Sequence, residues 1–321
     1  MLYSLCAQHS IPHRNTKKWI VAQNSEQYSE LEKVHAFATS ISVPTHFVSP
    51  SEAARREPSV RALAGVLESP TTGIIDSHAL MAHLEGRFQT LGGEVAFHTA
   101  VTGIERLPSG DYELQTSAFP PNPASSSDDP SSDPITTQTL INSAGLSAIP
   151  VSNLLLPPAR HLTPHYAKGT YYTFSPSSSP SSPSTPPLPR TLIYPAPTPG
   201  HPGLGTHLTL DLANNIRFGP DVEWVSDPTN LAPNDSRLEE ARAQIAKFWP
   251  RVREGELRPG YCGVRAKLGR GGAVAGGEGW SDFVVREEEG YSGFVNCLGI
   301  ESPGLTSCLA IAEMVEGVLY R

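Results

Sequence analysis

The sequence predicts a mixed α/β (α+β) fold, with strand–helix units at both ends and a β-rich middle. Its 321 residues are enough for a sizeable core in one large or two ordinary domains. Short apolar runs followed by segments with helical spacing occur before residue 95 and after residue 139. Between residues 160 and 287, short runs with polar–apolar alternation lie close together, which indicates a mixed or antiparallel sheet.

In the first half of the chain, capping residues and periodicity mark helices between short strands. Ser25 is placed to cap a helix that reaches Phe37. The run S-P-S-E at 49–52 is a capping box, with Pro at the first helical position and Glu three residues after the cap. Asp76 is the expected cap of a helix that two glycines close. Strands are expected at 19–22, 95–101 and 112–116.

In the second half, strand candidates predominate. A strand at 139–145 runs into a small-residue turn and a helix at 146–155. One further helix is expected at 236–249. The remaining strand candidates are 191–194, 205–210, 216–218, 263–268 and 283–286. Two segments rich in Pro and Ser, 118–134 and 175–189, are predicted to be disordered insertions because they contain little that could form a core.

Composition and charge exclude several classes of protein. The net charge of −8 disfavours a nucleic-acid-binding surface, and the sequence holds no apolar run long enough to span a bilayer. The four cysteines are scattered without a C-x-x-C pair, which favours reduced thiols in an intracellular protein. The closest histidine pairs, at 161/165 and 78/83, do not have the spacing that places two ligands on one helix face, so no metal site is expected.

The last stretch of the chain carries the first functional signal. The apolar run 294–298 predicts a buried strand, and 307–320 has the spacing of a packed helix. Between them lies a glycine-containing turn in which Ser302 and Thr306 are placed to cap the helix start. A strand, a turn and a helix N-terminus present backbone N–H groups and the positive end of a dipole. This geometry suits a phosphate or the electron-rich edge of a flavin, although turn chemistry alone also explains the glycines.

An ordered set of short motifs resembles the D-amino-acid-oxidase-like FAD-dependent oxidoreductases, and within them the L-2-hydroxyglutarate dehydrogenase branch. The resemblance covers nearly the whole chain. Its carriers are K-W-I-V-A at 18–22, E-P at 57–58, S-P-T-T-G-I-I-D at 69–76, I-N-S-A-G-L at 141–146, L-I-Y-P at 192–195, G-T-H-L-T at 205–209, R-F-G-P at 217–220, G-V-R-A-K at 263–267 and G-I-E-S-P-G-L-T at 299–306.

The chain departs from the family at its start. The family opens with a strand, a G-x-G-x-x-G turn and a helix that hold the FAD pyrophosphate. This sequence has no such opening, so we expect an N-terminally truncated member with a Rossmann-like FAD-binding domain that lacks its first strand–turn–helix. The comparable glycines at 269–277 are interpreted as a flexible hairpin loop, because no helical pattern follows them directly.

The resemblance implies FAD as the cofactor and assigns residues to it. The strand and turn that include Ala144 and Gly145 would lie under the FAD, where small residues let the backbone approach closely. Val101 matches the position whose backbone meets the adenine. The turn at the flavin ring would supply Gly299, Gly304, Leu305 and Thr306. A buried strand with a glycine turn, and a core valine, are the alternative interpretations of the first two groups.

On the substrate side, the resemblance points to three residues. Arg265 would bind a substrate carboxylate through its planar fork, as an Arg in a similar segment does in related amino-acid oxidases. His207 would accept the hydroxyl proton as hydride leaves for the flavin. Tyr171 would line the substrate site, in the β layer that faces the flavin. An edge-strand arginine, a structural histidine and a core tyrosine are the alternatives.

The expected function is therefore an FAD-dependent dehydrogenase of a small 2-hydroxy acid, with the electron acceptor left open. The alternatives are an amino-acid or amine oxidase of the same fold, and a non-catalytic fragment that cannot hold FAD. The resemblance implies FAD-domain parts at 73–150 and 288–321, with the substrate domain mainly at 11–72 and 160–287 of 1–321. The family resemblance implies location in the mitochondrion. The chain itself shows no targeting segment.

Overall fold

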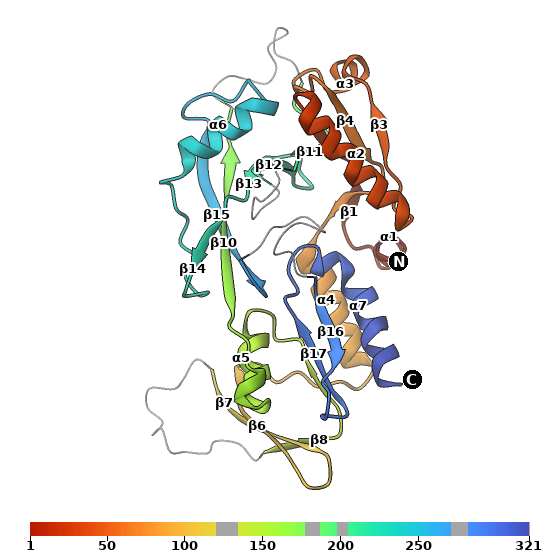
Figure 1. The fold of residues 1–321 in the computed structure, drawn as a ribbon, viewed down its shortest axis with the longest axis vertical. Helices are drawn as coiled ribbons and strands as arrows, with labels where there is room; N and C mark the ends of the chain where they lie inside the picture. The colour runs from red at the N-terminus through yellow and green to blue at the C-terminus, as the bar shows by residue number, and fades with distance from the viewer. Residues whose placement is uncertain (120–133, 177–186, 198–204, 271–281, 321) are drawn as a thin grey trace.

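A nine-stranded mixed sheet is the largest layer of the computed structural model (Figure 1), which describes residues 1–119, 134–176, 187–197, 205–270 and 282–320. Its strand order is β14-β10-β13-β12-β11-β2-β4-β3, and β15 pairs with β10. Only the β11–β2 pair is parallel among these described pairings, so the predicted mixed sheet is confirmed. The strands are β2 (Lys18–Ala22), β3 (His46–Val48), β4 (Gly65–Ser69), β10 (His165–Phe174), β11 (Leu192–Pro195), β12 (His207–Leu210), β13 (Ile216–Gly219), β14 (Glu223–Val225) and β15 (Leu257–Lys267).

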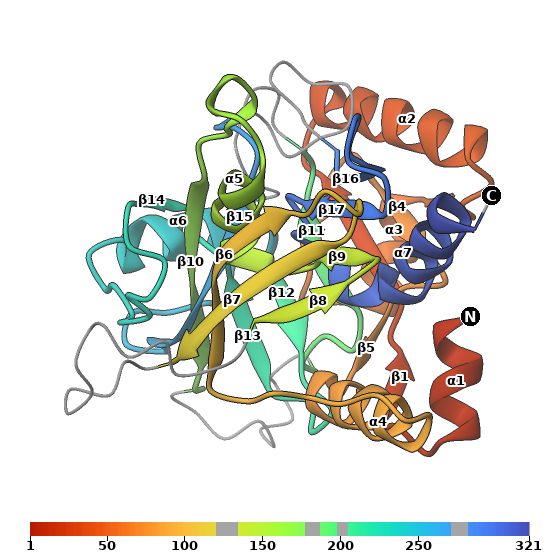
Figure 2. The ribbon, with the colours of Figure 1, turned by 90° about the horizontal axis from the view of Figure 1, so that it is seen from below.

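Three smaller sheets accompany the large one. The sheet β16-β17-β9 contains an antiparallel and a parallel pair, while β6-β7-β8 and β1-β5 are antiparallel. Figure 2 shows β6, β7 and β8 side by side across the view from below. These strands are β1 (His13–Asn15), β5 (Gly73–Ile75), β6 (Thr99–Arg106), β7 (Tyr112–Ala118), β8 (Ile135–Thr137), β9 (Leu140–Asn142), β16 (Val284–Glu287) and β17 (Phe294–Leu298).

The helices in the first half of the chain begin at or near the predicted caps, with one correction. Ser49 accepts a hydrogen bond from the backbone of Glu52, and Asp76 caps its helix as expected. The cap of the second helix is Asn24 rather than Ser25, because the extended Asn24 accepts the N–H of Gln27. The helices are α1 (Leu2–Gln8), α2 (Ser25–Ser40), α3 (Pro50–Arg56), α4 (Ser77–Thr90), α5 (Ala148–Leu155), α6 (Leu238–Phe248), α7 (Gly304–Leu319), and the 3₁₀ turns Gly145–Ser147 and Pro158–Arg160.

The expected strand at 95–101 was placed too early, because β6 covers Thr99–Arg106. The turn between Leu107 and Asp111 fixes the pairing of β6 with β7, and residues before Thr99 fall outside that hairpin. Val95 and Phe97 are accordingly exposed.

The main core lies between one face of the nine-stranded sheet and α6. Alternate side chains of the strands point to this face, and Trp19, Phe218 and Ile193 are fully buried there. Ile245 and Trp249, from α6 and the residue after it, pack against them. Helix α2 covers β2 and β4 at the other end of the sheet. The strand residues between these core positions therefore point to the opposite face.

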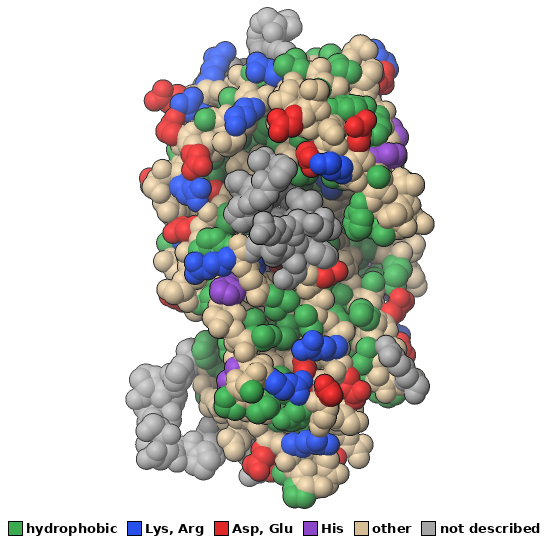
Figure 3. Space-filling model, viewed as in Figure 1, with side chains coloured by type: hydrophobic (Ala, Val, Ile, Leu, Met, Phe, Trp, Pro, Cys, Tyr) green, Lys and Arg blue, Asp and Glu red, His purple; other side chains and the backbone are tan. Residues whose placement is uncertain are grey.

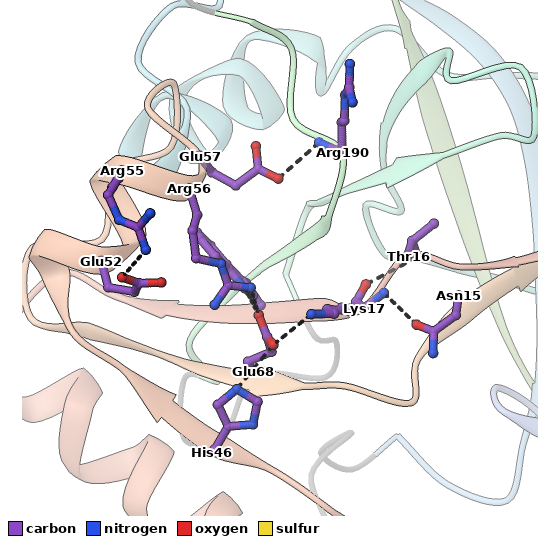
Figure 4. Close-up of polar contacts among 11 residues, drawn as sticks. Asn15, Thr16, Lys17, His46, Glu52, Arg55, Arg56, Glu57, Glu68 and Arg190 are labelled. Carbon is purple, nitrogen blue, oxygen red and sulfur yellow. Dashed lines mark hydrogen bonds and ion pairs between the residues drawn. The ribbon is translucent and has the colours of Figure 1, made fainter.

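Glu68, on β4, is a buried carboxylate that joins four elements (Figure 4). It accepts a 2.6 Å hydrogen bond from Trp19 Nε1 and pairs with the Arg56 guanidinium of α3. Lys17 Nζ lies 3.5 Å and His46 Nε2 3.2 Å from its Oε1. Burial raises the pKa of Glu68, but the bonds from Trp19 and Arg56 outweigh burial and lower the pKa below its usual value.

The two predicted insertions lie largely outside the described residues, as does most of the predicted hairpin loop at 269–277. Their edges belong to the fold: Ala118 ends β7, and Leu188 packs against the main core. The four cysteines are unpaired. On the face seen in Figure 3, basic and acidic side chains of the described residues are interspersed. No helix within the described ranges is long and apolar enough to cross a bilayer.

Candidate active site

The strand registers place the predicted substrate residues on the sheet face opposite α6. Tyr261, Tyr171, Gly219, His207 and Tyr194 form one row across five strands, because each is paired with or next in register to its neighbour. Tyr171 stacks on Tyr261 with ring centroids 4.8 Å apart, and Tyr194 stacks on His207 at 3.9 Å. Gly219 stands between the two stacks with a φ of +142°, and an added Cβ would lie 2.8 Å from the Thr170 carbonyl oxygen and 3.0 Å from Tyr171. The close approach of β13 to β10 therefore requires a glycine here.

His207 is buried and neutral in this setting. Burial, together with the nearby charges of Arg265 and Lys18, lowers the pKa of His207 to about 3. Its Nδ1 lies 3.2 Å from the carbonyl oxygen of Gly205, so this nitrogen carries the proton and donates. The described residues provide no hydrogen-bond partner for Nε2. That nitrogen is consequently the acceptor that the imidazole can offer to a ligand.

Arg265 reaches across β15 and β10 toward a carboxylate of the last turn. Its guanidinium lies 3.6 Å from Glu301, whose other oxygen is 2.7 Å from Lys267 Nζ. Burial raises the pKa of the Tyr171 hydroxyl, while the charge of Arg265 and its hydrogen bond partly oppose this. The structure thus brings Arg265 and Tyr171 together on this face. The Arg265 side chain is 33% exposed and therefore accessible from solvent.

Except for Val101, the residues assigned to the cofactor lie at or just beyond the ends of two parallel strands. Asn142 of β9 is in register with Asn296 of β17, so the turns that contain Ala144, Gly145 and Gly299 leave the same edge of the sheet. Nδ2 of Asn142 donates to Asn296 Oδ1 at 2.8 Å, and both side chains are buried. Ligands of such sheets bind beyond the carboxyl ends of parallel strands. Gly145 has a positive φ of 58°, and open space surrounds its missing Cβ.

The start of α7 differs from the prediction in its cap. The helix begins at Gly304, with Pro303 at the cap position and no side-chain cap. Ser302 lies too early to cap it, and the Thr306 hydroxyl donates to the Pro303 carbonyl instead. The described residues accept no hydrogen bond from the N–H groups of Leu305 and Thr306. An uncapped first turn with exposed amides therefore fits an electron-rich ligand such as the flavin ring edge.

Val101 lies apart from both groups, in β6, where it packs against the cluster around Tyr112 and Phe294. Its register partner is Thr116 of β7. A cavity of about 380 Å³ between α6 and the ends of the central strands contains none of the predicted site residues. The part of the chain that the structure describes holds no group of three metal-ligating side chains.

Sequence reasoning missed four residues of the open sheet face. Lys18 and Tyr194 stand within two of the quoted motifs but were given no role, and Lys18 Nζ lies 5.2 Å from the Tyr194 ring. Glu301 was also unassigned, although it is the one acidic residue of the 299–306 turn. Arg217 lies 3.7 Å from Asp211 and over the Tyr261 ring. A charge within a strand of otherwise apolar or small residues is the signal that could have found Lys18 and Arg217.

A polar sheet face beside two glycine turns at the ends of parallel strands fits a flavin-dependent oxidoreductase. The chain belongs to the FAD dependent oxidoreductase family (DAO), whose model matches residues 1–316. FAD is the cofactor of this family, and the open turns at Gly145 and at the start of α7 are the groups that fit it.

Comparisons with individual proteins agree with the family. The chain is 32% identical to the mitochondrial L-2-hydroxyglutarate dehydrogenase of Arabidopsis thaliana, over all of this chain and 70% of that protein. It is 26% identical to the L-2-hydroxyglutarate dehydrogenase of Salmonella houtenae, over 68% of this chain and 46% of the relative. The fold is similar to the FAD-bound L-α-glycerophosphate oxidase of Mycoplasma pneumoniae, with a TM-score of 0.78, 19% identity, and coverage of 97% and 74%.

Proposed function

We propose that this chain oxidises a small 2-hydroxy acid of the hydroxyglutarate type to the 2-oxo acid. The observation that carries the proposal is the Arg265–Glu301 pair. A guanidinium on the open sheet face already holds a carboxylate, and that carboxylate belongs to the turn assigned to the flavin ring. The name of the Arabidopsis relative supports the substrate class, and it also supports a mitochondrial location.

Arg265 and His207 would have separate roles in this reaction. Arg265 exchanges Glu301 for the C1 carboxylate of the substrate, which orients C2 toward the cofactor turns. His207 Nε2 accepts the proton of the 2-hydroxyl group as C2 becomes a carbonyl carbon. Bound FAD supplies the acceptor for the hydride that leaves C2. Burial is the main cause of the low pKa of His207, and the charges of Arg265 and Lys18 lower it further; substrate carboxylates beside these cations would remove the electrostatic part of the shift and make the imidazole a better base.

Two measurements test the proposal. The first is the visible absorption spectrum of the chain after incubation with FAD and desalting, in which retained flavin absorbance is expected. The second compares Arg265→Ala with Arg258→Ala, an exposed arginine on the same strand. Loss of the carboxylate pair should raise the KM for 2-hydroxyglutarate about 30-fold in the first variant only.

Clear results would refute the assignment. An unchanged KM in Arg265→Ala would remove Arg265 from the substrate site. Oxidation of glycine or D-amino acids in place of 2-hydroxyglutarate would identify an amino-acid oxidase instead. A colourless chain after desalting would show that these turns do not hold FAD in this chain.

A further inference from the structure

We propose that the Lys18 ammonium binds the second anionic group of the substrate and so selects a dicarboxylic over a monocarboxylic 2-hydroxy acid. The inference rests on the proposed function of the face that carries Arg265 and His207. It adds a residue that sets specificity at the end of the site away from the C1 carboxylate.

Lys18 is a cation without an anion among the residues that the structure describes. It lies at the start of β2 and reaches the same sheet face as Tyr194, whose ring centroid is 5.2 Å from Nζ. Within the described residues, no carboxylate and no hydrogen-bond acceptor contacts this Nζ. Its neighbour Lys17, by contrast, lies 3.5 Å from Glu68. Burial lowers the pKa of Lys18, as expected for an ammonium that has lost water and gained only an aromatic ring.

The other cations of the same face have anions. Arg265 and Lys267 share Glu301, and Arg217 lies 3.7 Å from Asp211. Among the described cations of this face, Lys18 therefore differs in having no carboxylate partner. A half-buried charge without a partner is costly to the folded protein, so a purely structural lysine at this place has no evident benefit. A ligand anion would provide the missing partner.

The imidazole of His207 lies between the two ends of this arrangement. Burial lowers the pKa of His207 most, and the charges of Arg265 and Lys18 both add to this effect; Lys18 approaches the imidazole past the Tyr194 ring that stacks on it. In the proposed arrangement, a molecule with an anion at each end pairs with both cations. The hydroxyl next to its C1 carboxylate then lies on the His207 side. A five-carbon dicarboxylate has this distribution of charge, whereas a three-carbon monocarboxylate leaves Lys18 unpaired.

An ammonium is a point charge that does not distinguish a carboxylate from a phosphate by geometry. The anion at Lys18 is therefore assigned by experiment as well as by charge. We assign it as a carboxylate, because the hydroxyglutarate-type substrate of the proposed function carries its second carboxylate at the end away from C1. A phosphate with a neutral polyol, as in glycerol 3-phosphate, would leave the planar fork of Arg265 without its ligand.

The test measures, by calorimetry, the binding of two 2-oxo acids and one phosphate ester to the chain, and it requires no turnover. The ligands are 2-oxoglutarate, pyruvate and glycerol 3-phosphate, and the variants are Lys18→Met and Lys33→Met. Lys33 is an exposed lysine of α2, so its variant loses the same charge away from the face. Lys18→Met should raise the Kd of 2-oxoglutarate about tenfold or more and leave that of pyruvate unchanged. Lys33→Met should change neither.

A stability measurement separates binding from structure. Because Lys18 lacks a partner, Lys18→Met should unfold at the same urea concentration as the wild type, or at a higher one. An unchanged Kd for 2-oxoglutarate in Lys18→Met overturns the assignment, as does an equal loss for both acids. Tighter binding of glycerol 3-phosphate than of 2-oxoglutarate overturns the choice of a dicarboxylate. A wild-type chain that binds neither acid overturns the proposed function itself.

Discussion

Replacement of Glu68 by Gln tests whether the buried carboxylate holds β4, β2, β3 and α3 together. Gln has the same shape and still accepts the Trp19 hydrogen bond, so the change removes only the charge. Breaking a fully buried ion pair costs about 3–5 kcal/mol. The partners here are partly hydrated, with side-chain exposures of 27% for Arg56 and 49% for Lys17. We therefore expect about 2 kcal/mol, in the range of hydrogen bonds to charged groups.

The assay is urea unfolding followed by tryptophan fluorescence, with Glu52→Gln as the matched control. Glu52 lies on α3 and makes an exposed pair with Arg55, which solvent screens, so its loss should change stability far less than the loss of the Glu68 charge. The pKa of folded Glu68 is depressed, so its contribution is complete above the unfolded-state value of about 4.3 and is lost as pH falls through the folded value. The difference in the free energy of unfolding between wild type and Glu68→Gln should therefore shrink as the pH falls below the unfolded-state pKa and through the folded one. A variant as stable as Glu52→Gln at pH 7 would refute the reasoning.

Two further predictions concern the site. Asn296→Ala removes three buried hydrogen bonds, which join Asn296 to Asn142, Ser152 and Glu288. In urea titrations it should lower the free energy of unfolding by about 3 kcal/mol. A loss no larger than that of the exposed control Asn230→Ala would contradict this. His207 has a folded pKa of about 3, so unfolded chains bind its proton first and stability falls as pH drops from about 6.5. His207→Gln should abolish about 2 kcal/mol of the loss between pH 7 and pH 5, and equal losses in both proteins would disprove burial of the neutral ring.

Sequence reasoning located most elements because their signals are local. The capping box at Ser49 and the cap at Asp76 are satisfied by residues two to three positions away, so the pattern alone predicts them. The helix α7 was found by its periodicity, but its cap was not, because Pro303 takes the cap position and displaces Ser302 from it. Local chemistry thus predicts the presence of an element better than its first residue.

The arrangement of the site could not be predicted in the same way. Tyr171 meets Tyr261 because of a strand register between segments far apart in the chain, and His207 meets Tyr194 because of the register of β11 with β12. The motifs suggested Tyr171, His207 and Arg265 individually, and their roles stay predictions. No sequence pattern signals that Glu301 pairs with Arg265, since that contact joins a strand to a distant turn.

The parallel pair β11–β2 has a consequence for how the protein is made. Lys18 is in register with Leu192, so the centre of the sheet joins chain segments that are synthesised far apart in time. Until β11 leaves the ribosome, β2 can pair with β4 on one side only and presents an open strand edge on the other. We therefore expect nascent chains that end before Pro195 to depend on chaperones. The face that includes Lys18 is completed late in synthesis.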